Sequence, residues 1–447
     1  MKLASVDAIR ASLEGVIPAT MATCAPDGTP NVAYLSQVEY VDPDHVALSW
    51  QFFNKTRENV LANPVARLTI VDPDTIARHC LLLRYLRTET AGPLFERMKA
   101  KLAGIASHSG MAGVFRLRGS DVYRVEEILR LPGEVLPAPP ARRSLLAAVR
   151  ACVQRLSGAG DLQALFETAL EAVEAEFGIR HALVLLADAA GHRLYTVASR
   201  GYPESGVGSE IPFGRGIVGV AARERTPIRV GHAQAEYAYG RAMREAALRE
   251  GIALETEIPL PGLADSRSQL AVPIEAFGRL LGVLFADSAE DLRFGYDDED
   301  ALVTVAGSLG TAIHVLQATA EADAAAESGP AGVPAPGGTP VAVRHFAEND
   351  SIFLDGEYLI KGVAGRIFHA LVADFLATGR TEFTNRELRL DPRVKLPEIG
   401  DNLEARLILL SRRLAERDAG ARLEKSGRGR LRLVLTRPLR LVEVKGE

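Results

Sequence analysis

The chain has 447 residues, of which 47% are hydrophobic and 24% charged, and its formal net charge is −5. Because a single hydrophobic core stops growing at about 250 to 300 residues, this length predicts two to four domains. The composition is that of an ordinary globular protein and excludes general disorder. We find no apolar run of membrane-spanning length and no signal-peptide pattern, so we expect a cytoplasmic protein without membrane contact.

Cysteine and motif content disfavour several function classes. The three cysteines, Cys24, Cys80 and Cys152, are widely spaced and form no C-x-x-C pair. This spacing predicts free thiols and disfavours a disulfide framework or structural zinc. The sequence also lacks a nucleophile–base–acid set, a Walker loop and a dinucleotide fingerprint. We therefore expect no metal site, and the motifs do not support catalysis.

Two stretches rich in Gly and Pro, residues 131–140 and 327–340, are typical of linkers. Each of the three segments that they separate is long enough to be a domain. The predicted domains are residues 1–136, 142–320 and 341–447, with a flexible linker at 321–340.

The first segment is rich in β-branched, alternating sequence, which predicts strands. Pro26 and Gly28 have the chemistry of a hairpin turn between the first two strands. The expected strands are residues 19–24, 31–41, 46–53 and 66–71.

Residues 49–64 run from a strand through a polar turn into a short helix, which is a favourable arrangement for an anion. Lys55 supplies a positive charge and Thr56 a hydroxyl, and the start of the helix offers unpaired N–H groups. A phosphate group would suit this place.

Together with the turn at 27–30 and the run 63–68, this segment resembles the pyridoxamine 5′-phosphate oxidase-like split barrels. The resemblance covers about residues 16–125 and implies a dimeric barrel that binds FMN, or deazaflavin or haem in some branches. It implies that Lys55 and Thr56 hold the phosphate and that Ser49 and Gln51 line the strand beside the flavin.

The sequence departs from the oxidase pattern in two places. Asn54 stands where the oxidases carry an Arg, and the strand at 31–38 lacks their basic residues. A barrel kept for dimerisation alone, with Lys55 an ordinary solvated lysine, is therefore the alternative. Tyr85, Arg87 and His108 lie near the expected site, although a lone histidine is more often a structural residue.

The middle segment combines helices and strands and reads as an α+β domain. The expected elements are an opening helix at 162–177, strands at 182–186, 193–198, 270–274 and 280–286, and a closing helix at 297–316. Four glycine-containing or strand-like runs resemble, in order, the signatures of a GAF domain: 213–222, 226–230, 268–274 and 278–284.

A GAF domain is an α/β sandwich, and the likeness implies a small-molecule cavity under a lid, here expected at 233–251. Phe294, Asp298 and Glu299 fit half of the cyclic-nucleotide pattern, but no Asn-Lys pair precedes them. Cyclic nucleotide is therefore disfavoured. Packing of Phe294 and the two carboxylates at a helix start would explain these residues equally well.

The last segment is locally basic, since Lys and Arg outnumber Asp and Glu from Arg380 to Arg440. A strand at 351–359, helical stripes at 367–376 and 403–414, and a hairpin at 422–435 resemble the winged-helix domain of response regulators. The likeness implies that the third helix and the hairpin contact DNA. The implied DNA-binding residues are Arg406, Arg412, Arg413, Lys425, Arg428 and Arg430.

Ile408 and Leu409 disagree with this assignment, because polar side chains are normally needed to contact bases. A protein partner is the alternative for that surface. Taken together, the sequence predicts a multidomain α+β protein: a homodimeric transcriptional regulator that senses a ligand or redox signal and binds DNA. The alternatives are an FMN-dependent oxidoreductase with regulatory domains, and a flavin-free adaptor.

Overall fold

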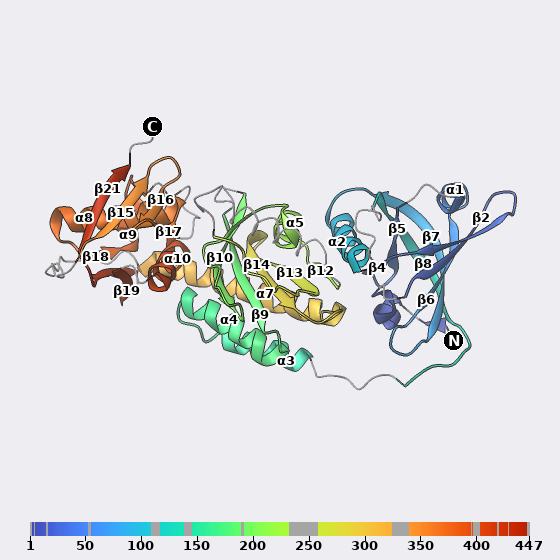
Figure 1. The fold of residues 1–447 in the computed structure, drawn as a ribbon. Helices are drawn as coiled ribbons and strands as arrows, with labels where there is room; N and C mark the ends of the chain where they lie inside the picture. The colour runs from blue at the N-terminus through green and yellow to red at the C-terminus, as the bar shows by residue number, and fades with distance from the viewer. Residues whose placement is uncertain are drawn as a thin grey trace.

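The computed structural model describes most of the chain. The described residues are 2–3, 5–14, 17–51, 55–108, 117–137, 145–188, 192–231, 258–323, 339–394, 396, 403–417, 420–427 and 429–444. Three units follow one another along the molecule, and we call them the N-terminal barrel, the middle domain and the C-terminal domain (Figure 1).

The N-terminal barrel is built on an antiparallel eight-stranded sheet in the order β3-β2-β6-β7-β8-β5-β4, with β1 added to β8. The strands are β1 (Lys2–Leu3), β2 (Ala19–Cys24), β3 (Pro30–Leu35), β4 (Val38–Asp42), β5 (His45–Trp50), β6 (Val65–Val71), β7 (Arg78–Glu89) and β8 (Gly119–Arg130). A 3-10 helix, η1 (Val6–Leu13), and the helices α1 (Lys55–Ala62) and α2 (Pro93–His108) complete the unit.

Two strand predictions for this unit need correction. The run 31–41 is not one strand, because β3 pairs with β2 whereas β4 pairs with β5 at the opposite end of the sheet. The break at Ser36 and Gln37 is therefore where the barrel splits. The run 46–53 stops at Trp50 as a strand, and residues 52–54 lie outside the described part. Strands β7 and β8, the longest in the sheet, were not predicted.

The middle domain has a six-stranded antiparallel sheet in the order β11-β10-β9-β14-β13-β12. Its strands are β9 (His181–Asp188), β10 (Arg193–Arg200), β11 (Glu210–Pro212), β12 (Ile228–Val230), β13 (Ser268–Ala276) and β14 (Arg279–Ser288). Its helices are α3 (Leu145–Leu156), α4 (Leu162–Phe177), α5 (Gly216–Glu224) and α7 (Tyr296–Asp323). Helices α4 and α7 contact one face of the sheet, with α3 packed on both, and α5 covers the other face.

Glycines permit the tight turns of this sheet. Gly214 and Gly216 have φ of 82° and 61° where the chain turns from β11 into α5, and Gly278 has φ of 72° in the β13–β14 hairpin. A β-carbon at Gly219 would lie 2.4 Å from the Pro212 oxygen, so a larger residue would push α5 away from β11.

Helix α7 extends beyond the expected closing helix at both ends. Its segment Tyr296–Ala318 is long and apolar enough to cross a membrane by length and composition, although the sequence had suggested no such run. In the fold this helix belongs to the core, because Leu302, Leu309 and Ile313 are at most 1% exposed against the sheet. Core packing explains its apolar composition.

The C-terminal domain has two small sheets around three helices. The four-stranded sheet has the order β17-β16-β15-β21, and the three-stranded sheet has the order β18-β20-β19. The strands are β15 (Val341–Phe346), β16 (Ser351–Leu354), β17 (Glu357–Ile360), β18 (Glu382–Thr384), β19 (Ala421–Gly427), β20 (Arg430–Leu435) and β21 (Leu439–Val444). The helices are α8 (Gly362–Thr378), α9 (Asn385–Leu390) and α10 (Leu403–Glu416).

The predicted strand at 351–359 is wrong, because this run is a hairpin. Asp355 and Gly356 both have positive φ, 50° and 95°, and turn β16 back into β17. A single hydrophobic cluster runs from α3 and α4 of the middle domain into α8 and α10 of the C-terminal domain. These two domains therefore share buried apolar surface.

Candidate cofactor site and domain interfaces

The four residues predicted to hold a flavin lie together where β5 ends and α1 begins. Ser49, Gln51 and Thr56 are buried. The Gln51 amide donates to Ser49 Oγ at 3.3 Å, and the Asn31 amide donates to Thr56 Oγ1 at 2.8 Å. Strand β3 therefore helps to fix the hydroxyl that the sequence assigned to phosphate.

Two buried polar atoms near this place have no hydrogen-bond partner among the described residues, namely Gln51 Oε1 and Ser120 Oγ. Ser120 faces Ser49 across the β5–β8 pair. Because a buried polar atom without a partner costs about 1–3 kcal/mol, such atoms are suited to bonds with a bound polar group. These two polar atoms could form hydrogen bonds with the polar edge of a flavin ring, so the residues present fit this cofactor.

Lys55 also fits the phosphate end of such a cofactor. Its side chain is 55% exposed, and its nearest carboxylate, Glu58, is 3.7 Å away. The amine stands at the N-terminus of α1, where helix N–H groups and the dipole favour an anion. Arg57 does not contribute to this phosphate site, because it binds Asp121 at 2.7 Å and lies 3.7 Å above the Trp50 ring.

Two of the three further candidates from the sequence lie on β7. The Tyr85 hydroxyl is 2.7 Å from Thr88 Oγ1, and Thr88 in turn donates to Asp121. Arg87 pairs with Glu89 on its own strand. The side chain of His108 lies outside the described part of the chain.

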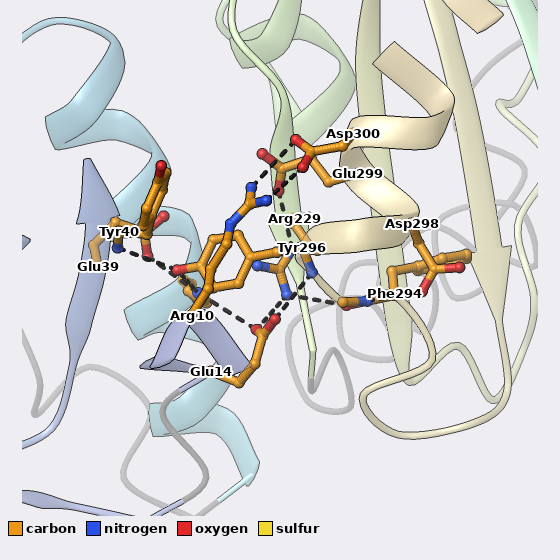
Figure 2. A network of polar contacts seen from close by, with 12 residues as sticks. Arg10, Glu14, Glu39, Tyr40, Arg229, Phe294, Tyr296, Asp298, Glu299 and Asp300 are labelled. Carbon is orange, nitrogen blue, oxygen red and sulfur yellow. Dashed lines mark hydrogen bonds and ion pairs between the residues drawn. The ribbon is translucent and has the colours of Figure 1, made fainter. Parts of the chain in front are cut away.

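A cluster of charges that the sequence did not predict joins the barrel to the middle domain (Figure 2). Arg229 of β12 is 5% exposed and binds Glu14 of the barrel at 2.6 Å and Glu299 of α7 at 3.0 Å. Its guanidinium also donates to the Phe294 carbonyl. One arginine thus joins the end of η1 to the start of α7.

Tyr296, the first residue of α7, is buried among side chains of the barrel core. Its hydroxyl accepts from Lys101 Nζ and from the Tyr40 backbone N–H, both at 3.3 Å. Lys101 also binds Glu39 at 3.1 Å. The start of α7 is therefore inserted into the barrel.

Three cations lie close to the Tyr296 ring. Arg10, Lys101 and Arg229 are 4.6, 4.7 and 4.4 Å from its centroid. Arg10 also forms an ion pair with Asp300. A cation near an aromatic ring contributes about 0.5 kcal/mol when exposed to about 2 kcal/mol when desolvated, and four carboxylates surround these three cations. We call these eight side chains the Tyr296 cluster: Arg10, Glu14, Glu39, Lys101, Arg229, Tyr296, Glu299 and Asp300.

Electrostatics within the cluster keep its groups charged despite burial. Burial alone would raise the pKa of Glu39, but the positive charges of Lys101, Arg97 and Arg229 outweigh it and hold that pKa below its ordinary value. Burial disfavours the charge on Arg229, yet Glu14 and Glu299 raise its pKa. Burial, together with Glu39, raises the pKa of Tyr296 to about 12.

Two of the arginines assigned to DNA from the sequence, Arg406 and Arg412, lie at the junction between the C-terminal and middle domains. Arg406 is 6% exposed as a side chain, is 3.2 Å from Asp188 of β9 and lies 4.1 Å above the Tyr195 ring. Arg412 donates to the Val197 carbonyl at 2.7 Å and to Glu167 at 3.0 Å.

The remaining predicted contacts are distributed differently. Arg413 is buried and binds the Leu359 carbonyl and Glu416 within its own domain. Lys425 of the hairpin binds Asp161 of the middle domain at 3.0 Å and Glu404 at 3.3 Å. Arg428 lies outside the described residues. The DNA contacts stay a prediction, and in this arrangement the middle domain covers much of the surface concerned.

A cavity of about 430 Å³ lies at the same junction. Its apolar lining comes from Leu316 of α7, Leu407 and Ile408 of α10, and Leu423 and Leu431 of the hairpin. The Lys425 ion pairs lie beside it. The two domains are thus not fully packed against one another here.

Comparison with known proteins agrees with this architecture. Residues 5–122 match the family model of pyridoxamine 5′-phosphate oxidase, and residues 159–314 match that of the GAF domain. The chain carries a pyridoxamine 5′-phosphate oxidase-like barrel followed by a GAF domain. No curated protein matches the chain.

Solved structures with similar folds cover one domain at a time. The GAF domain of an Acinetobacter phosphoenolpyruvate-protein phosphotransferase is 23% identical and covers 39% of this chain and 94% of its own, with a TM-score of 0.31. Free methionine-R-sulfoxide reductase from Neisseria meningitidis is 22% identical, with coverages of 39% and 91% and a TM-score of 0.32. An FMN-binding protein from Syntrophomonas wolfei is 17% identical, with coverages of 28% and 84% and a TM-score of 0.24.

The cyclic-nucleotide half-pattern of the GAF domain has structural roles. Phe294 is buried in the core, and Asp298 accepts from the Gly295 N–H at the start of α7. Glu299 binds Arg229, a contact between strands and helix that no local pattern indicates. The lid expected at 233–251 lies outside the described residues.

Buried polar groups hold the segment that leads into β13. Asp287 accepts from Ser266 Oγ at 2.5 Å and from the Leu263 N–H at 3.2 Å. Burial raises the pKa of Asp287. Neither Asp287 nor Ser266 was predicted from the sequence, because their pairing joins a loop to a distant strand.

Proposed function

We propose that this chain is a homodimeric regulator in the cytoplasm that senses a redox or small-molecule signal and reports it on DNA. In this proposal the barrel binds FMN, the GAF domain binds a small molecule, and the C-terminal domain acts as a winged helix. The single observation that carries the proposal is the path of α7. It begins in the barrel at Tyr296, and Leu316 near its other end lines the junction with α10.

A change in the barrel could reach the C-terminal domain along this helix. From Tyr296 to Leu316 an α-helix spans about 30 Å, and its core residues hold it against the sheet between these points. A ligand shifts such an equilibrium by its difference in affinity for the two states. A regulator of this kind therefore needs a ligand site in the barrel or the GAF domain that favours one position of α7.

FMN would supply a two-electron redox centre next to β5. In the proposal Lys55 and the α1 N-terminus bind the phosphate, Thr56 donates its hydroxyl proton, and Gln51 and Ser49 orient the ring. The Gln51 oxygen and Ser120 hydroxyl, which lack partners among the described residues, support a polar group at this place. Haem or deazaflavin would use the same barrel with different partners.

A second copy of the chain would cover the free edge of the barrel. Val32 and Tyr34 project from the edge strand β3 with 65% and 81% exposure, and Leu61 of the neighbouring α1 is 60% exposed. Apolar side chains this exposed on an edge strand favour an interface. The homodimer therefore belongs to the proposal.

The DNA output rests on the element order of the C-terminal domain. Strands β15–β17, the helices α8, α9 and α10, and the hairpin β19–β20 follow one another in an order similar to that of winged-helix domains, with Arg430 on the hairpin. Phosphate contacts by such side chains would supply most of the affinity and make it salt-dependent. A protein-binding role is the rival, because α10 already contacts the GAF domain.

Flavin binding is tested by absorbance and mass spectrometry of the purified full-length protein, followed by FMN titration. We expect Lys55→Ala to weaken FMN binding about tenfold, which corresponds to about 1.4 kcal/mol for one lost charge contact. Lys99→Ala is the matched control, since Lys99 is equally exposed and also pairs with a glutamate three residues away. A colourless protein that takes up no added FMN would contradict the flavin role.

A further inference from the structure

Helix α10 has almost no exposed surface in this structure. Along its whole length, Leu403–Glu416, the exposed residues are Ala415 and Glu416 at the C-terminal end. Its own domain covers one side through α8, β17 and β19, and α4 and β10 of the GAF domain contact another. A helix covered on these sides cannot enter the major groove.

The side of α10 that contacts the GAF domain follows helical spacing. Arg406, Leu409 and Arg412 are three residues apart and therefore lie on neighbouring positions of one face. Arg406 and Arg412 bind GAF groups, and a β-carbon at Gly208 of the GAF domain would lie 3.4 Å from Leu409 Cδ1. The apolar Leu409, which base contact does not explain, has a protein neighbour.

The GAF domain presents three carboxylates to this basic surface. Asp188 lies at Arg406, Glu167 accepts from Arg412, and Asp161 accepts from Lys425 of the hairpin. Guanidinium and ammonium groups bind carboxylates and phosphates by the same charge-assisted hydrogen bonds. The carboxylates thus stand where phosphate oxygens would have to bind, and the two ligands exclude each other.

We propose that the GAF domain holds the C-terminal domain closed by binding, through Asp161, Glu167 and Asp188, the basic face that would otherwise contact nucleic acid. The proposal rests on the proposed DNA output for its consequence, but the closure itself is a property of this chain alone. The cavity of about 430 Å³ at the junction leaves part of the contact unpacked. Separation of the domains therefore loses fewer van der Waals contacts than separation of a fully packed interface would.

Closure and DNA binding are then reciprocal. A ligand of the barrel or GAF domain that favours the open form strengthens DNA binding, and DNA must then strengthen the binding of that ligand by the same factor. A sensor built in this way forms no new DNA-binding surface when it opens. It only removes the GAF carboxylates, which compete with phosphate for the same basic side chains.

The test compares the full-length protein with a variant that removes the three carboxylate charges, Asp161→Asn with Glu167→Gln and Asp188→Asn. Asn at 161 still caps α4, where Asp161 now accepts from the Ala164 N–H. Glu171→Gln with Asp265→Asn and Asp291→Asn is the control, because it changes the net charge equally on groups away from the junction. Hydrogen exchange of residues 403–416 measures opening, and retention of a mixed-sequence duplex of about 30 base pairs measures binding.

We expect the junction variant to exchange α10 amides about tenfold faster than the control does and to bind the duplex about tenfold more tightly. Unchanged α10 exchange in a folded junction variant would overturn the closure, whatever its DNA binding. Faster exchange with no duplex retention would support the closure and overturn the DNA output instead.

If the triple variant fails to fold, Glu167→Gln alone keeps the test decisive. This carboxylate is 53% exposed, so its loss leaves the GAF core intact. We expect about twofold faster exchange of α10, in proportion to the loss of one exposed ion pair. No change relative to Glu171→Gln would count against the closure.

Discussion

The two domain junctions use charge in different ways. At the barrel–GAF junction, the Tyr296 cluster mixes cations and carboxylates from both sides, so ion pairs form both across the boundary and within each side. At the junction with the C-terminal domain, the cations come from α10 and the hairpin and the carboxylates from the GAF domain. In the first arrangement each surface carries charges of both signs, whereas separation of the second leaves a basic and an acidic surface that other ions can neutralise.

This difference indicates a fixed junction and a releasable one. Separation of the Tyr296 cluster would break the pairs Arg229–Glu14 and Arg10–Asp300 and expose charges of both signs on each side. Separation at α10 exposes a surface that a polyanion can cover. The predictions below test this contrast, and each compares a change at one place with a matched change nearby.

Replacement of Arg229 should have the largest effect. Arg229→Met removes a buried arginine that pairs with two half-buried carboxylates, Glu14 and Glu299, and we expect a loss of about 3–5 kcal/mol in the free energy of unfolding. Chemical denaturation measures this. Arg225→Met is the control: Arg225 is 46% exposed in its pair with Glu275, so its loss should cost at most about 1 kcal/mol. Equal losses of stability in Arg229→Met and Arg225→Met would contradict a special role of the Tyr296 cluster.

Substitution at the contact between α7 and the sheet should have the next largest effect on stability. A β-carbon at Gly310 would lie 2.4 Å from the Glu275 carbonyl oxygen, so Gly310→Ala must push α7 away from β13. We expect a loss of about 2 kcal/mol in thermal or chemical unfolding. Gly307→Ala on the same helix meets no atom within 4 Å and should stabilise by up to about 1 kcal/mol. If both substitutions behave alike, α7 does not fit the sheet this closely.

Replacement of Arg406 should lower the free energy of unfolding less than replacement of Arg229, although both side chains are buried. In Arg406→Met, Asp188 keeps Arg193 at 3.2 Å as a partner, and the new side chain still covers the Tyr195 ring. We expect about 1 kcal/mol of destabilisation, together with faster hydrogen exchange of α10. A loss as large as that of Arg229→Met would show that the second junction is not releasable.

A fall in pH should lower the free energy of unfolding through Glu39 at the barrel–GAF junction. This is the smallest of the four expected effects, and it is absent near neutral pH. The pKa of Glu39 is lower in the fold than its ordinary 4.5, so its contribution to stability is fully present above that value. The contribution is lost as pH falls through the folded pKa, because protonation removes the partner of Lys101. Unfolding measured from pH 7 to pH 3 should show this loss in the natural protein and a smaller one in Glu39→Gln. The same pH dependence in both would exclude Glu39 as its source.

Local chemistry made much of the architecture predictable. The strand at 19–24, the helix beginning at Leu162 and the hairpin at 422–435 follow from alternation, helical spacing and turn residues within a few positions of sequence. The four flavin candidates are also close in sequence, so their proximity needed no fold. The split at Ser36 and Gln37 was not predictable in this way, because each half of the run pairs with a different distant strand.

The sequence by itself determined many of the strands, helices and turns, and it placed the resemblances to a split barrel and a GAF domain on their motifs. Only the tertiary structure decided what the charges do. Arg229, Lys101 and Glu39 look like surface residues in sequence, yet long-range packing buries them around Tyr296. The basic face of α10 looks free in sequence, yet a neighbouring domain covers it. Charge pairing depends on distance in space, and the chain fixes that distance only when it folds.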